Sequence, residues 1–129
     1  MSTTSSFITL PSGLSITQPT SLFYNGSFHL PLDPSATFAT VNPATGKPIV
    51  TLNEAKKDDV DLIVKSARKA YESDEWQDMR STDRGKLLFK LADLVEQDKQ
   101  TFAELESFDA GKTVASAILD VEEAIGVIR

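Results

Sequence analysis

The chain has 129 residues, of which 40% are hydrophobic and 25% are charged, as in an ordinary globular protein. Its formal net charge of −6 argues against nucleic acid or an anionic membrane surface as the main partner. The absence of cysteine excludes disulfides, thiolate zinc sites and a cysteine nucleophile within these residues, and no apolar run approaches the roughly 20 residues of a membrane-spanning helix.

Residues 1–20 are rich in Ser, Thr and Pro and show little periodicity, so we predict a flexible tail there. This segment lacks the positively charged start and the apolar block of a secretory signal. It also lacks the arginines of a mitochondrial presequence. A cytoplasmic location is therefore the default expectation.

Two pairs of extended segments follow the predicted tail. Residues 22–30 alternate around Asn25-Gly26, the dipeptide that best tolerates the positive φ angles of a type I′ turn, and this pattern predicts a β-hairpin. Residues 37–41 and 48–52 form a second predicted pair around the turn-like sequence NPATGK.

From residue 58 onward the pattern becomes helical. Apolar residues recur at three- and four-residue steps over residues 60–71, and Asp58 and Asp59 lie in the first turn, where negative charge suits the helix dipole. Ser81 is predicted to be the N-cap of a second helix, whose apolar stripe runs over residues 87–95. The width of that stripe indicates that other protein covers most of this helix.

Two further helical patterns complete the chain. Phe102, Leu105 and Phe108 share one helical face, and Gly111 predicts the C-terminal stop of that helix. The last amphipathic pattern runs over residues 114–129 with no stop signal after it. We expect a truncated domain, and a helix that ends at a true C-terminus is the alternative.

The order of these elements predicts an α+β segment, with an N-terminal β-hairpin and short strands followed by three to four amphipathic helices, and not a series of βαβ units. No two glycines have the close G-x-G spacing of a nucleotide cradle. His29 is the only histidine and has no partner pattern for catalysis, so we expect a surface or strand-pairing role. Asp109 lies where the helix dipole disfavours negative charge, and Lys112, a backbone donor or a bound cation is expected to compensate it.

Several segments together resemble the N-terminal part of the aldehyde dehydrogenase superfamily. The resemblance covers about residues 22–129, in which Trp76 and Arg84-Gly85 also match, and it rests on stretches in the family's order: LFYNGSF, TVNPATGKPI, DVDLIVKSARKAY, KLLFKLAD and ESFDAGK. This chain departs from the family where DAGKT replaces the usual DNGKP and where Lys56-Lys57 precede the first helix. These departures concern local turns.

The resemblance implies an α/β family architecture in which aldehydes are oxidised to carboxylic acids with NAD or NADP. Residues 21–129 would be an incomplete N-terminal part of the cofactor-binding domain. Family members use a cysteine nucleophile, and this chain has no thiol, so we expect no catalytic residue, no cofactor-binding residue and no activity in the chain alone. The complete relative would take an aldehyde substrate, form a homo-oligomer and bind neither nucleic acid nor membrane.

In many relatives the matching positions hold a structural monovalent cation. The resemblance therefore implies metal-ligating roles for Thr40, for the carbonyl of Val41 and for Asp109, with further ligands outside this chain. A cation there would also compensate the charge of Asp109.

A function of a different class stays open. The chain could be a small non-catalytic protein that folds alone and binds a partner such as a dehydrogenase subunit, since four amphipathic stretches can bury a core at this size. A fragment of an enzyme, in contrast, is expected to expose apolar faces.

Overall fold

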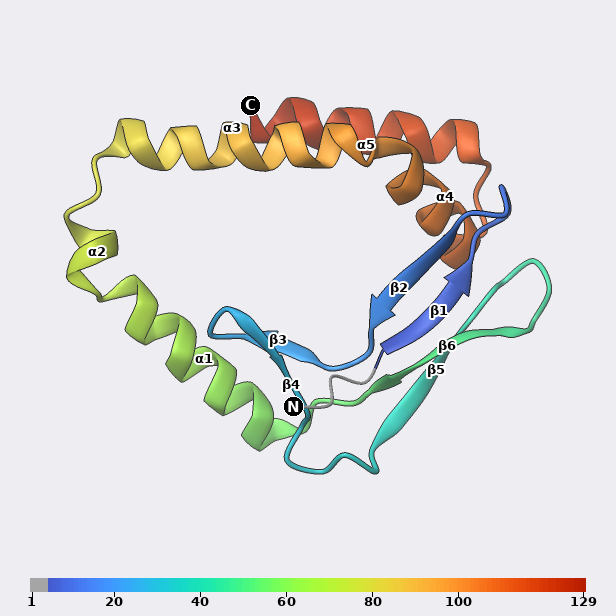
Figure 1. The fold of residues 1–129 in the computed structure, drawn as a ribbon, viewed down its shortest axis with the longest axis horizontal. Coiled ribbons are helices and arrows are strands. Elements are labelled where there is room, and N and C mark those ends of the chain that lie inside the picture. The colour runs from blue at the N-terminus through green and yellow to red at the C-terminus, as the bar shows by residue number, and fades with distance from the viewer. Residues whose placement is uncertain (1–4) are drawn as a thin grey trace. The chain divides into compact units, whose positions relative to one another are not determined.

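A computed structural model describes residues 5–129 as six short strands followed by five helices, which confirms the predicted α+β order (Figure 1). The strands are β1 (Ser5–Thr9), β2 (Ser15–Pro19), β3 (Leu22–Tyr24), β4 (Ser27–His29), β5 (Thr37–Val41) and β6 (Pro48–Asn53). The helices are α1 (Lys57–Tyr71), α2 (Asp74–Gln77), α3 (Ser81–Gln97), α4 (Lys99–Ala110) and α5 (Val114–Ile128).

The strands form three antiparallel pairs, each a two-stranded sheet of neighbours in sequence. In the β3–β4 hairpin, Asn25 and Gly26 have φ angles of 49° and 74°, and Tyr24 pairs with Ser27 across the turn. Both central residues thus occupy the left-handed region that a type I′ turn requires. The hairpin predicted around Asn25-Gly26 is confirmed.

The β1–β2 pair lies where the sequence predicts a flexible tail. Ile8 pairs with Ile16, and Ile8 is only 4% exposed. The loop between these strands contains Pro11 and Gly13, and Gly13 has a φ angle of 88°. Ser and Thr flank these few apolar residues, which hides the strand pattern in a polar composition. Residues 1–4 of the predicted tail lie outside the described residues.

The four long helices lie where the sequence predicts them, but the short helix α2 adds a fifth that was not predicted, and the start of α3 differs from the prediction. Ser81 is the first helical residue, and Arg80 occupies the N-cap position without a side-chain cap. The guanidinium of Arg80 donates instead to Asp83 at 2.8 Å in the first turn. The prediction of Ser81 as N-cap is therefore wrong by one residue. Gly111, with a φ angle of 76°, ends α4 as predicted.

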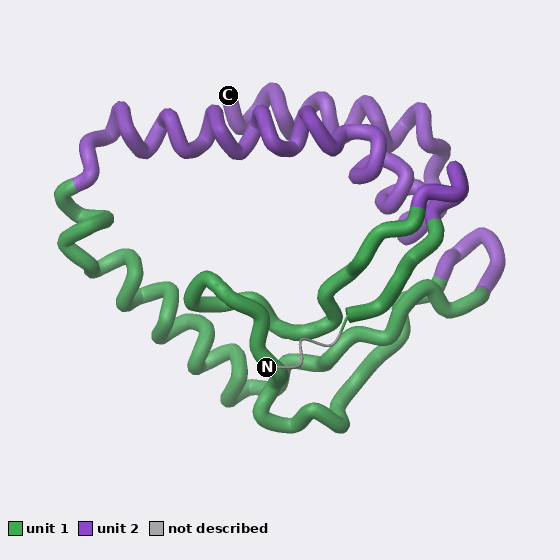
Figure 2. The backbone as a smooth tube through the Cα atoms, viewed as in Figure 1, with its two compact units in different colours: residues 1–9, 15–41, 47–78 green, residues 10–14, 42–46, 79–129 purple. Residues whose placement is uncertain are grey.

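The described chain divides into two compact units, coloured separately in Figure 2. Within the described residues, unit 1 comprises residues 5–9, 15–41 and 47–78, which include the strand pairs and the first two helices. Unit 2 comprises residues 10–14, 42–46 and 79–129, which include α3, α4, α5 and the loops of two hairpins.

Unit 2 has its own hydrophobic core, in which α5 packs against α4 and α3. Its buried members are mostly small or β-branched: Ala92, Ala103, Ala117, Val121 and Ile125. Alanine at the contacts lets helix backbones approach closely, so three helices bury a core without large side chains.

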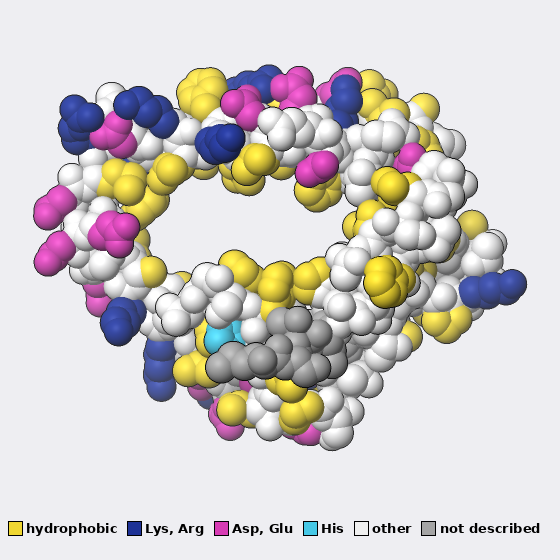
Figure 3. Space-filling model, in the orientation of Figure 1, with side chains coloured by type: hydrophobic (Ala, Val, Ile, Leu, Met, Phe, Trp, Pro, Cys, Tyr) yellow, Lys and Arg dark blue, Asp and Glu magenta, His cyan; other side chains and the backbone are white. Residues whose placement is uncertain are grey.

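Large apolar side chains remain on the surface of both units (Figure 3). On α1, Val64 is 59% exposed, and on α3, Leu88 is 53% exposed. The apolar stripe predicted for α3 thus exists, but among the described residues only Ala92 of that helix is fully buried. Exposed apolar stripes of this kind mark surfaces that contact other protein.

Candidate functional site

The predicted cation ligands of unit 1 lie at the end of strand β5. Thr40 pairs with Val50, and the register shifts between Thr40 and Val41, where a β-bulge interrupts the ladder. The hydroxyl oxygen of Thr40 is buried and has no hydrogen-bond partner within residues 5–129. A buried hydroxyl without a partner is costly, so this atom is one that a ligand could satisfy.

The predicted cation ligand of unit 2 is Asp109, the penultimate residue of α4. Its carboxylate is exposed, and within the described part of the chain it forms no hydrogen bond or ion pair. Thr40 and Val41 belong to unit 1 and Asp109 to unit 2, so the structure assembles no three-ligand site within either unit. The cation site stays a prediction.

Lys112 does not compensate Asp109. Its ammonium donates to Glu106 at 2.6 Å and also to Asp120, so it joins the end of α4 to α5. Hydrogen bonds to Asp120 and then to Glu106 raise the pKa of Lys112 above its ordinary value. Lys112, one of the three partners proposed for Asp109, therefore pairs with other carboxylates.

Within unit 2, the turn after Asn42 lies against the end of α4, and both segments belong to the stretches that resemble the family. The Asn42 side chain is buried and accepts hydrogen bonds from the backbone N–H of Ala44 at 2.8 Å and of Thr45 at 3.3 Å, which fixes the NPATGK turn. A Cβ atom placed on Gly111 would lie 2.6 Å from Pro43 Cγ. Only glycine therefore fits at the end of α4 against this turn.

The sequence did not predict the burial and the acceptor roles of two carboxylates. Asp59 accepts from the backbone N–H of Leu32 at 2.8 Å and of Lys56 at 2.9 Å, so it caps α1 and holds the segment after β4. Glu104 accepts from Ser12 N–H at 3.3 Å and from the Gln100 amide at 2.9 Å. The position of Asp59 in the first turn of α1 could be predicted from the sequence. The donors that are distant in sequence could not, because those hydrogen bonds depend on tertiary contacts.

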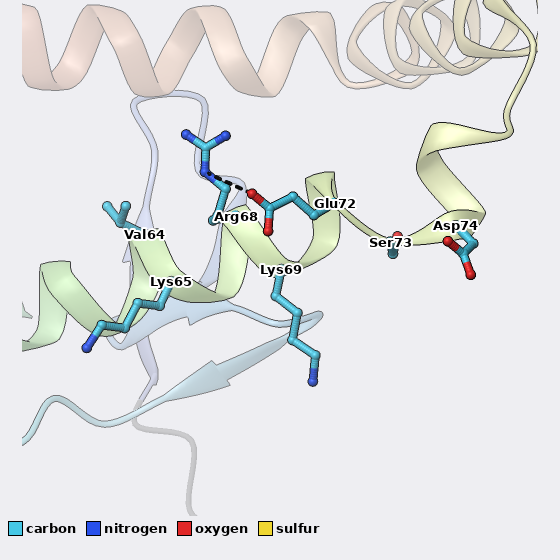
Figure 4. A pocket seen from close by; sticks show the side chains of 7 residues that line it. All are labelled: Val64, Lys65, Arg68, Lys69, Glu72, Ser73 and Asp74. Carbon is cyan, nitrogen blue, oxygen red and sulfur yellow. Dashed lines mark ion pairs between the residues drawn. The ribbon is translucent and has the colours of Figure 1, made fainter.

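A shallow hollow of unit 1 lies along α1, and Figure 4 shows the side chains that line it. Arg68 Nε lies 3.8 Å from Glu72, while Lys65 and Lys69 point away from this pair. A binding site needs a few polar groups that converge on one point. The cations along α1 do not converge.

The acidic side chains and the histidine of the described residues are spread over the chain. No group of three or more His, Cys, Asp or Glu side chains among residues 5–129 is placed to hold a metal ion. His29 Nε2 lies 2.8 Å from the hydroxyl of Ser27, and the His29 ring stacks on Tyr24 at 4.1 Å. His29 pairs with Leu22 across the hairpin, which matches the predicted strand-pairing role. None of the described helices is long and apolar enough to cross a membrane.

Comparisons by family, by sequence and by structure all match this chain to aldehyde dehydrogenases. The aldehyde dehydrogenase family matches residues 32–129. An aldehyde dehydrogenase of Aspergillus niger is 42% identical over 122 residues, which cover 95% of this chain and 24% of that protein. Aldehyde dehydrogenase, cytosolic 1, of Macroscelides proboscideus is 44% identical over 114 residues, 87% of this chain and 23% of that protein. The NAD+ complex of an aldehyde dehydrogenase from Bacillus cereus aligns at a TM-score of 0.81 and 37% identity, over 85% of this chain and 22% of that one.

Proposed function

This chain belongs to the aldehyde dehydrogenase family, and we propose that it serves as the N-terminal part of an NAD- or NADP-dependent enzyme that oxidises an aldehyde to a carboxylic acid. The observation that carries this proposal is the match of residues 32–129 to the family, together with the similarity in fold to the Bacillus cereus enzyme. The chain spans 22–24% of the length of the relatives described above. Residues 21–129 would form part of the cofactor-binding domain.

The chain alone should not catalyse the reaction. Aldehyde oxidation in this family needs a thiolate that adds to the aldehyde and a bound nicotinamide that accepts hydride. The 129 residues contain no cysteine, and their glycines do not form a G-x-G loop. The segment therefore contributes structure to the enzyme, and the chemistry depends on residues that it does not supply.

The exposed stripe of α3 is the surface that we assign to contact with the remainder of the enzyme. Leu88, Leu91 and Leu94 are 53%, 47% and 45% exposed. Complete burial of one such leucine contributes about 1.5–3 kcal/mol, so covering the stripe would stabilise the complete enzyme substantially. Without that cover, the chain should self-associate or unfold with weak cooperativity as the temperature rises.

A structural monovalent cation is the second part of the proposal. The Thr40 hydroxyl, the Val41 carbonyl and the Asp109 carboxylate are oxygen ligands, which hard cations prefer. The unpartnered hydroxyl of Thr40 and the uncompensated carboxylate of Asp109 support this role, because both groups lack a partner among the described residues. When bound, the cation would supply charge compensation and would take no part in hydride transfer.

The complete enzyme is expected to be a cytoplasmic homo-oligomer. One relative is named a cytosolic aldehyde dehydrogenase. The aldehyde and the choice between NAD and NADP depend on parts of the enzyme outside these residues.

An activity assay tests the catalytic part of the proposal. The purified 129-residue chain is incubated with a short aliphatic aldehyde and either NAD or NADP, and absorbance of the reduced cofactor is followed. We expect no cofactor reduction above the buffer rate, while a full-length family member turns over under the same conditions. Titration of the chain into the reduced cofactor should leave the nicotinamide fluorescence unchanged. Cofactor reduction by the chain itself would overturn this reading.

A second candidate function is favoured by one observation. Unit 2 buries its own core of three helices, so part of the chain could fold and act alone as a non-catalytic partner of a dehydrogenase subunit. Size-exclusion chromatography distinguishes the two functions. A stable monomer that binds a complete dehydrogenase would favour the partner protein, and concentration-dependent association would favour the enzyme segment.

A further inference from the structure

The turn between β3 and β4 places an exposed asparagine directly before an exposed glycine. Asn25 and Gly26 are both exposed, and nothing lies within 4 Å of a Cβ placed on Gly26. Among the described residues, no hydrogen bond holds the Gly26 N–H. Gly26 is thus exposed, its N–H makes no hydrogen bond within the described residues, and it has no side chain to block an approach to its nitrogen.

We propose that Asn25 is a site of spontaneous deamidation that converts the turn to aspartate or isoaspartate. The Gly26 nitrogen loses its proton to solvent base and attacks Asn25 Cγ, so that a new N–Cγ bond closes a five-membered imide. The bond from Cγ to the side-chain nitrogen breaks, and that nitrogen takes a proton from water and leaves as ammonia. Water then opens the imide at either carbonyl. One water is consumed and one ammonia is released, and nothing is oxidised or reduced.

The two other asparagines of the sequence are protected from this reaction. Asn42 is buried and precedes Pro43, whose nitrogen carries no proton and cannot close the imide. Asn53 precedes Glu54, and the Glu54 N–H donates to the Ala36 carbonyl at 2.8 Å. Asn25 alone combines exposure with a following N–H that makes no hydrogen bond within residues 5–129.

The modification would weaken the hairpin. Aspartate adds one negative charge to a chain whose net charge is already −6. Isoaspartate adds a methylene to the backbone of a two-residue turn, which is incompatible with the pairing of Tyr24 with Ser27. The ring contact between Phe23 and Phe28, with centroids 5.0 Å apart, depends on the same register. Conversion would therefore loosen the cross-strand contacts of the hairpin.

The test follows the purified full chain during incubation at mildly alkaline pH. Proteolytic peptides are then sequenced by tandem mass spectrometry, and the isoaspartyl form is separated by chromatography. We expect Asn25 to gain about 1 Da on the order of tenfold faster than Asn42 or Asn53, because glycine leaves the attacking nitrogen accessible. The rate should rise with pH, because the attacking nitrogen must lose its proton.

Two controls make the result decisive. The variant Asn25→Gly keeps a residue that tolerates positive φ but removes the reacting amide, so it should show no mass gain at this turn. A synthetic peptide of residues 22–30 reports the same chemistry without the fold. If this peptide is converted while Asn25 of the full chain stays intact, the turn protects the residue and the proposal is wrong. A mass gain of the same size in Asn25→Gly would also overturn it.

Discussion

Units 1 and 2 differ in how they bury polar and apolar groups. Unit 2 has three helices around a core that includes Ala103 and Ala117, both 0% exposed. Unit 1 has three separate strand pairs, and Ile8 is its one fully buried large aliphatic side chain within the described residues. Its buried Asp59 instead ties α1 to the segment after β4. Helices can build a core from local contacts, whereas two-stranded sheets need another surface to be stable.

The largest effect should come from a charge in the core of unit 2. Ala117→Asp would place an unpaired carboxylate among α3, α4 and α5 and should destabilise unit 2 by about 3 kcal/mol or more. Ala115→Asp lies exposed in the first turn of the same helix and should have little effect. Urea unfolding followed by far-UV circular dichroism measures both variants. Equal stability of the two would contradict the core assigned to unit 2.

The next effect concerns the contact between α4 and the NPATGK turn. Gly111→Ala combines positive φ with a clash against Pro43 and should cost about 1–3 kcal/mol. Gly126→Ala is the matched control, because it lies in α5 with open space around it and should stabilise the helix by about 0.5–1 kcal/mol. Thermal unfolding of both variants checks these opposite signs. The contact has no importance if both substitutions stabilise the protein.

Unit 1 should respond most to the loss of its buried carboxylate. Asp59→Ala leaves the N–H groups of Leu32 and Lys56 without their acceptor and should cost about 1–3 kcal/mol. Asp58→Ala removes an exposed carboxylate of the same helical turn and should cost less than about 1 kcal/mol. Amide hydrogen exchange in α1 separates the two, and faster exchange is expected only for Asp59→Ala. Similar exchange in both variants would show that the buried carboxylate does not hold α1.

The smallest expected effect is a change in how the stability of unit 2 depends on pH in the acid range. Hydrogen bonds from Ser12 and then from Gln100 lower the pKa of Glu104 below its ordinary value. A lowered folded-state pKa gives stability that is fully present above the unfolded pKa and is lost as the pH falls through the folded pKa. Glu104→Gln should therefore reduce the loss of stability on acidification below the ordinary glutamate pKa. Chemical unfolding of both proteins at neutral and acid pH checks this difference, and parallel curves would contradict it.

Prediction from sequence succeeded where a local signal sets the structure. Asn25-Gly26 and Gly111 require positive φ, and the three- and four-residue spacing marks each long helix. It failed for β1 and β2, because Ser- and Thr-rich strands resemble a tail in composition. The acceptor roles of Asp59 and Glu104 could not be predicted, since each depends on a donor distant in sequence. Lys112 likewise had three nearby carboxylates to choose from, and only tertiary structure decides among them.

The intact mass of the native protein tests the central claim most directly. The protein would be captured from its source with an antibody against residues 58–112 and weighed without digestion. As the N-terminal part of an aldehyde dehydrogenase, the captured species should be several times heavier than the 14.1 kDa of these residues. A single species of 14.1 kDa would contradict the claim and would favour the small partner protein.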